Sequence, residues 1–173
     1  PDYIDAGWLA KASGTFCYNL DLFMMTPLQA LQSFISHSCN SQIAVIEGNR
    51  GLYDGMDHQG TYSTAELAKL LKAPVVIIID CTKATNTVAA MVLGCQNMDP
   101  DVSIKGIVLN RVATKRQESV IRKAISEKCG LPVLGTIPVL KKDPFPERHM
   151  GLTPFQEHKG IEESIAAVAE IGA

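Results

Sequence analysis

Acidic side chains gather in a glycine-rich stretch between Ile43 and Tyr62, which reads IAVIEGNRGLYDGMDHQGTY. Residues 43–46 form a short apolar run that predicts a buried strand, and Glu47 follows at its carboxyl end. The loop that comes next carries Asp54 and Asp57 among several glycines. Ligands bind beyond the carboxyl ends of parallel strands, and carboxylates placed there suit the chemistry of Mg²⁺ and phosphate. The alternative is a surface loop whose acids are merely solvated.

Two further apolar runs end in a polar residue. The β-branched run 75–79 ends in Asp80, and the run 104–109 ends in Asn110. A continuous apolar run has no polar face, so it belongs in a parallel sheet that is covered on both sides. Three polar side chains at successive strand ends, those of Glu47, Asp80 and Asn110, therefore predict a site at one edge of the sheet.

The first residues of the chain hold a second acidic pair. Asp2 and Asp5 are three positions apart and could converge on one cation if the turn between them is tight. Asp5 could equally cap a helix that ends at Gly14. Helix capping explains neither Asp2 nor Tyr3.

Composition excludes several classes of function. The formal charge is −2, and no block of Lys or Arg indicates binding to nucleic acid or to an anionic membrane. The five cysteines are dispersed without a CxxC pair, which argues against zinc and favours reduced thiols in the cytoplasm. No apolar run approaches the roughly 20 residues that cross a bilayer. No GxxxxGK[ST] loop occurs, and a start at Pro1 suggests a piece of a longer polypeptide.

The pattern predicts strands that alternate with helices across one domain, residues 1–173. This alternation is typical of a three-layer α/β fold with a mostly parallel sheet. The expected strands are 43–46, 75–79, 104–109 and 133–137, and the expected helices begin near residues 5, 27, 64, 84, 115 and 160.

Several long motifs resemble one family, the cobyrinic acid a,c-diamide synthases. They are PDYIDAGW, YNLDLFMM, VIEGNRGLYDGMD, STAELAKLLKAPVV, DCTKAT, GIVLNRV and DPFPERHMGL. The resemblance runs from Pro1 to about His158 and points to the synthetase domain of that family. It implies a P-loop NTPase-like fold of the dethiobiotin-synthetase type that is incomplete at the amino terminus. A P-loop strand is expected before Pro1, and a glutaminase domain with a nucleophilic Cys is expected after Ala173.

The resemblance also implies an activity in cobalamin biosynthesis. Enzymes of this family use ATP and Mg²⁺ to phosphorylate the a and c side-chain carboxylates of cobyrinic acid. Ammonia, released from glutamine by a glutaminase domain normally in the same chain, then displaces the phosphate. The chain is therefore expected to be part of a cytoplasmic carbon–nitrogen ligase with a corrinoid substrate. The isolated segment is expected to be inactive, and lost strands would expose apolar surface that favours a homodimer.

Individual roles follow from the resemblance, position by position. Asp2, Tyr3, Asp5 and Asp54 are implied to be catalytic. Glu47 and Asp5 are implied to hold Mg²⁺. Asn110 is implied to read the adenine edge of ATP, and Asp80 and Lys83 are implied to line the nucleotide or substrate pocket.

Rival interpretations come from the same fold and from other classes. Sister amidases act on related tetrapyrroles, among them hydrogenobyrinate, Ni-sirohydrochlorin and the substrate of cobyric acid synthase. A partitioning-type ATPase switch shares the core fold but needs neither PDYID nor the acidic GLYDGMD loop. A non-catalytic interaction domain is the third alternative, which a complete gene without a P-loop would favour.

Overall fold

The computed structural model describes residues 3–140, 147–148, 151–152, 154–157 and 160–172. The chain divides into two compact units, one made of residues 1–20 and 140–173 and the other of residues 21–139. Each is described by itself below. The expectation of a single domain over residues 1–173 stays a prediction.

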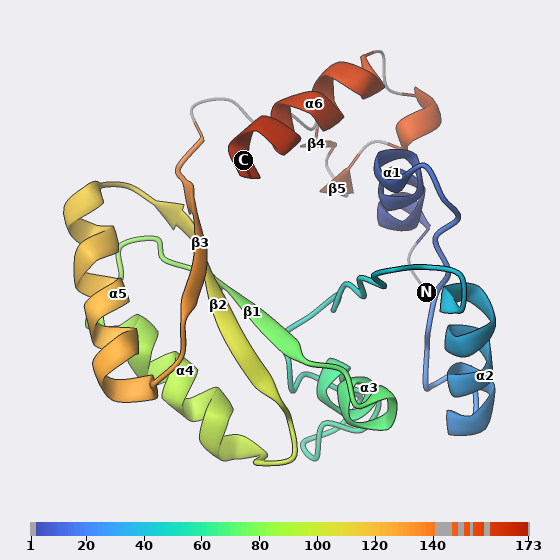
Figure 1. Ribbon diagram of the computed structural model, residues 1–173, viewed down its shortest axis with the longest axis horizontal. Helices are drawn as coiled ribbons and strands as arrows, with labels where there is room; N and C mark the ends of the chain where they lie inside the picture. Colours follow the sequence, from blue (N-terminus) through green and yellow to red (C-terminus); the bar gives the residue numbers. More distant parts are fainter. Residues whose placement is uncertain (1–2, 141–146, 149–150, 153, 158–159, 173) are drawn as a thin grey trace. The chain divides into compact units, whose positions relative to one another are not determined.

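The larger unit is built on a parallel sheet of three strands (Figure 1). The strands are β1 (Val75–Asp80), β2 (Ile104–Val112) and β3 (Val133–Pro138), and they lie in the order β1-β2-β3. Helices α4 (Asn86–Met98) and α5 (Lys115–Cys129) make the two crossovers between them. The predicted α/β fold with a parallel sheet is confirmed.

The core of this unit lies between the sheet and the two crossover helices, which Figure 1 shows on the same side of the strands. Ile107 and Leu109 of β2 are completely buried against Val88 of α4 and against Ile121 and Ile125 of α5. Each such side chain contributes roughly 1.5–3 kcal/mol by leaving water. The ends of β1 and β2 are therefore held on a well-packed platform.

The opposite face of the sheet is open in the described part of the chain. Val76 and Ile78 of β1 are 47% and 64% exposed, and Leu134 of β3 is 58% exposed. They alternate along their strands with residues that face the helices, such as Ile79. The sequence predicted that both sides of the β-branched run are covered. Within the described residues, only the side that faces α4 and α5 is covered.

Helix boundaries follow the local sequence signals. Helix α2 (Pro27–Ser38) starts at a capping box between Thr26 and Gln29, with Pro27 as its first residue. Ser63 caps helix α3 (Thr64–Leu71) by accepting a hydrogen bond from the backbone N–H of Glu66. Thr114 caps α5 in the same way, and Gly130 ends that helix with a left-handed φ of 64°.

The strand predicted at residues 43–46 is wrong. The structure assigns this segment no strand, and Ile43 and Val45 are 80% and 89% exposed. A β-branched run becomes a strand only where a neighbouring strand pairs with its backbone groups. Among the described strands none pairs with 43–46, so the segment stays outside the sheet and exposed to water.

The smaller unit combines helices with short irregular segments. Its elements are α1 (Ile4–Ser13), the antiparallel pair β4 (Glu147–Arg148) and β5 (Gly151–Leu152), the 3₁₀ turn η1 (Phe155–Glu157) and α6 (Ile161–Gly172). Helix α1 packs against η1. Asp5 does not cap α1, because Tyr3 occupies the N-cap position and Asp5 lies in the first turn. A carboxylate in the first turn is still favourable, since it faces the positive end of the helix dipole.

Among the described helices of both units, none is long and apolar enough to span a bilayer.

Candidate functional site

Asp80 and Asn110 lie side by side at the carboxyl edge of the sheet. They are register partners at the ends of β1 and β2. The backbone N–H of Cys81 donates a 2.8 Å hydrogen bond to the carbonyl of Asn110, which extends the pairing one residue beyond the strand. The predicted proximity of these two strand-end residues is confirmed.

The Asp80 carboxylate is held on both of its oxygens. One accepts a hydrogen bond from the backbone N–H of Thr82 at 2.8 Å, and the other pairs with the guanidinium of Arg111 at 3.0 Å. Hydrogen bonding to Thr82, followed by the bond and the charge of Arg111, lowers the pKa of Asp80 below its ordinary value. Asp80 is therefore ionised at neutral pH, and its charge is directed to Arg111.

Asn110 presents its amide in a defined orientation. Its Oδ1 accepts a 2.9 Å hydrogen bond from the backbone N–H of Arg111. The Nδ2 group makes no hydrogen bond with any described residue, so it can donate to a ligand. Arg111 has a left-handed φ of 56°, which L-residues seldom adopt. A bulky residue in this conformation next to a strand end is typical of a functional site.

Lys83 lies in the turn that follows β1 and also has a left-handed φ, of 53°. The turn closes through a 3.1 Å hydrogen bond from the N–H of Ala84 to the carbonyl of Cys81. Lys83 is an exposed residue three positions after Asp80. The structure thus brings together, at the carboxyl edge, Asp80 at the end of β1, Lys83 in the turn that follows, and Asn110 near the end of β2.

The glycine-rich loop after Glu47 has an internal scaffold of its own. Asp57 Oδ1 accepts hydrogen bonds from the backbone N–H groups of Gln59 and Thr61, and Oδ2 accepts one from the Thr61 hydroxyl at 2.7 Å. These bonds, that of the Thr61 side chain first, lower the pKa of Asp57. Gly55 is required because a Cβ there would collide with the backbone of Gly60 and Thr61. Asp54, an exposed residue, is carried next to this scaffold.

The anchor of this loop is not at the carboxyl edge. The hydroxyl of Tyr53, the neighbour of Asp54, donates a 2.6 Å hydrogen bond to the carbonyl of Cys95 near the end of α4. A crossover helix runs back along the sheet, so the end of α4 lies toward the amino ends of the strands. The structure therefore does not place Asp54 beside Asp80 and Asn110.

Glu47 follows a segment that is not a strand, so the expected series of three strand-end residues is reduced to two. Glu47 is exposed, in a stretch without regular secondary structure. Tyr3, 73% exposed, and Asp5 belong to the smaller unit, and Asp2 lies outside the described residues.

Within the described ranges no three His, Cys, Asp or Glu side chains gather as a metal site. Mg²⁺ takes only one or two protein carboxylates beside water and phosphate. A single carboxylate such as that of Glu47 is therefore a chemically suitable ligand for Mg²⁺.

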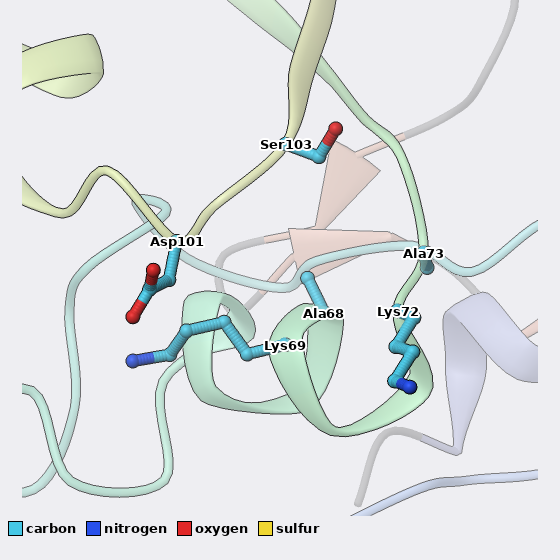
Figure 2. Close-up of a pocket in the computed structure, with 6 residues that line it drawn as sticks. All are labelled: Ala68, Lys69, Lys72, Ala73, Asp101 and Ser103. Carbon is cyan, nitrogen blue, oxygen red and sulfur yellow. The ribbon is translucent and has the colours of Figure 1, made fainter.

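A pocket of about 310 Å³ is shown in Figure 2. It is lined by Ala68, Lys69, Lys72, Ala73, Asp101 and Ser103, which border the amino ends of β1 and β2. Lys69 already pairs at 2.7 Å with both Glu66 and Asp99, and these contacts raise its pKa. The pocket lies at the amino ends of the strands, whereas ligands bind at the carboxyl ends, and the charge of Lys69 is already neutralised by Glu66 and Asp99. The pocket is therefore a poor candidate for a nucleotide site.

Three residues at the carboxyl edge were missed by sequence reasoning, namely Thr82, Arg111 and Gln117. Arg111 carries no local signal, since only the register of β1 and β2 brings it to Asp80. Gln117 has a signal, because Thr114-x-x-Gln117 has the spacing of a capping box.

Comparisons with known proteins agree with the motifs. Cobyrinate a,c-diamide synthase of Magnetococcus marinus is 42% identical over 171 residues, which are 99% of this chain and 37% of the relative. The enzyme of the same name from Archaeoglobus fulgidus is 40% identical over 172 residues, 99% of this chain and 37% of the relative. Hydrogenobyrinate a,c-diamide synthase of Brucella ovis is 41% identical over 177 residues, 99% of this chain and 39% of the relative. The resemblance stated above is confirmed.

The chain spans less than two-fifths of the length of these relatives. No solved structure matches it significantly. A family model described as "AAA domain" matches residues 28–143, most of the chain and nearly all of the larger unit. The chain therefore belongs to the AAA domain family.

Proposed function

We propose that the chain is the nucleotide-binding part of an ATP- and glutamine-dependent ligase that amidates the a and c carboxylates of cobyrinic acid. The similarity along 99% of the chain to proteins named cobyrinate a,c-diamide synthase carries this proposal. Hydrogenobyrinate is the second candidate substrate, favoured by the 41% identity to the Brucella ovis enzyme. The corrinoid substrate, the glutaminase domain that supplies ammonia and a cytoplasmic location are all parts of the proposal.

The carboxyl edge of β1 and β2 is the proposed nucleotide site. The Nδ2 group of Asn110 would donate to an acceptor on the base, because its Oδ1 is engaged by the backbone of Arg111. Lys83 would face phosphate or a substrate acid with its ammonium group. Asp80 would orient Arg111, with which it pairs.

From the resemblance alone, Asp54 is the proposed group beside the substrate carboxylate, where it would accept a proton from incoming ammonia. The structure does not place it beside Asp80 and Asn110. The bonds of Asp57 hold the neighbouring loop before any ligand arrives, so the loop needs little reordering on binding. Asp2 and Tyr3 are proposed as supporting catalytic groups from the resemblance alone.

Glu47 and Asp5 are each proposed as ligands of Mg²⁺. Bound Mg²⁺ neutralises the charge that develops on a transferring phosphoryl group.

Asp54→Asn in the complete natural polypeptide tests the function. The variant is expected to lose about 10²-fold or more in amide formation from ATP, glutamine and cobyrinate, the usual size of a lost acid–base group. ATP affinity is expected to stay near that of the wild type. Asp101→Asn is the matched control, because Asp101 is also an exposed acid but lies outside the motifs that imply catalytic roles, so it should affect neither quantity.

If Asp54→Asn amidates at the wild-type rate, Asp54 and its loop have no catalytic role. A wild-type protein that amidates neither cobyrinate nor hydrogenobyrinate would overturn the function itself. Parallel assays with the two substrates decide between them.

A further inference from the structure

The Gln117 side chain joins the two loops at the carboxyl edge of the sheet. Its Nε2 group donates to the carbonyl of Cys81 at 2.6 Å and to that of Ala84 at 2.8 Å, both in the loop after β1. Its Oε1 accepts a 2.8 Å hydrogen bond from the N–H of Ala113, in the loop after β2. One amide group therefore fixes backbone from both loops.

The two carbonyls that Gln117 holds flank the turn that carries Lys83. Cys81 and Ala84 also bond to each other across this turn, and Lys83 between them has the left-handed φ of 53°. Such a conformation persists in a bulky residue only when its surroundings fix it. Gln117 supplies that constraint from a helix, the more rigid kind of element.

The third bond reaches Ala113, which directly follows the end of β2 that carries Asn110 and Arg111. Gln117 is set by the start of α5, where its own N–H donates to the Thr114 hydroxyl at 3.1 Å. This bond fixes the backbone of Gln117, and the three bonds of its side chain fix the amide group. Gln117 thus relates the position of Lys83 to that of Asn110.

We propose that Gln117 is a positioning residue for the nucleotide site, holding the loop of Lys83 and the end of β2, which carries Asn110, at the spacing that a bound nucleotide requires. This inference rests on the proposed function, because it takes the nucleotide site to lie at this edge. It assigns Gln117 no contact with the ligand. The effect of the residue passes through Lys83 and Asn110.

The experiment compares three variants of the complete natural polypeptide by calorimetric titration with MgATP. Gln117→Leu removes all three side-chain bonds. Gln117→Glu keeps an acceptor for Ala113 but sets a carboxylate against the carbonyls of Cys81 and Ala84. Gln96→Leu is the control, since Gln96 donates a similar bond to the Cys129 carbonyl at 3.1 Å at the other end of α4.

Both Gln117 variants are expected to bind MgATP about tenfold more weakly or worse, while Gln96→Leu keeps the wild-type affinity. Gln117→Glu should recover part of the loss toward pH 5, because a protonated carboxyl can donate to one of the two carbonyls. The wild type and Gln96→Leu should show no such recovery. Hydrogen exchange at residues 81–84 should quicken in Gln117→Leu and not in Gln96→Leu.

Wild-type affinity in Gln117→Leu, or an equal loss in Gln96→Leu, would overturn the positioning role and leave the proposed function intact. If Gln117→Leu does not fold, the affinity and pH profile of Gln117→Glu decide by the same criteria. A wild-type protein that does not bind MgATP would overturn both this inference and the nucleotide site beneath it.

Discussion

The carboxylate of Asp80 and the guanidinium of Arg111 form an ion pair of 3.0 Å that connects the ends of β1 and β2. The two side chains are 50% and 64% exposed, so the pair itself adds little to stability. The backbone of Arg111 nevertheless adopts a left-handed φ of 56°. This conformation aims its N–H at the Asn110 side chain, which fixes the amide of that residue.

Substitution of Arg111 by glycine and by alanine distinguishes the effect of backbone strain on stability from the effect of the ion pair. Both changes remove the pair, but only glycine adopts the left-handed conformation without strain. We expect Arg111→Gly to be more stable than Arg111→Ala by about 1 kcal/mol in urea denaturation. Lys105, an exposed residue of β2 without positive φ, is the control, and there alanine should be the more stable of the two. The same order at both positions would contradict strain at Arg111.

A second network fastens α5 to β3. Arg122 donates to Glu118 at 2.7 Å, to the carbonyl of Val133 at 3.0 Å and to the hydroxyl of Thr136 at 3.0 Å. Arg122→Ala should lower the free energy of unfolding by about 1 kcal/mol, because it leaves a partly buried network without its donor. Lys123→Ala on the same helix should change it by less than about 0.5 kcal/mol, since Lys123 is 75% exposed and 3.8 Å from its partner.

The effect of Arg122 should depend on pH in a defined direction. The hydrogen bond from Arg122 is the main cause that lowers the pKa of Glu118 below its ordinary value. A lowered carboxylate pKa stabilises the fold above the unfolded-state value, and the stabilisation is lost as pH falls through the folded-state value. The difference between wild type and Arg122→Ala should therefore shrink between pH 7 and about pH 3. A difference that is constant over this range would show that Glu118 takes no part.

The elements that sequence predicted best are those whose signals are local. The caps at Ser63 and Thr114 fix helix starts within one residue, and the β-branched run after Pro74 forms β1. Residues 43–46 are also apolar and mostly β-branched but form no strand, because no neighbouring strand among the described residues pairs with their backbone.

Gln117 shows the same limit at the candidate site. Its spacing from Thr114 predicts a local capping bond, yet its side chain spans to Cys81 and Ala84, more than 30 positions away. Asp80 and Asn110 were predictable as neighbours because parallel strands align their ends. The partners Arg111 and Gln117 depend on register and helix placement, which single-residue patterns do not encode.

The open face of the sheet leads to a prediction about assembly. We propose that the 173-residue chain forms a homodimer through this face, where Val76, Ile78 and Leu134 are 47%, 64% and 58% exposed. A contiguous apolar surface on a sheet favours association. Ile78→Lys places a charge on the face and should give a monomer in sedimentation velocity at micromolar concentration. Met98→Lys is the control, since Met98 is 67% exposed at the end of α4 and should leave the dimer intact. If the wild-type chain is a monomer, or if both variants dissociate the dimer equally, the apolar face does not mediate self-association.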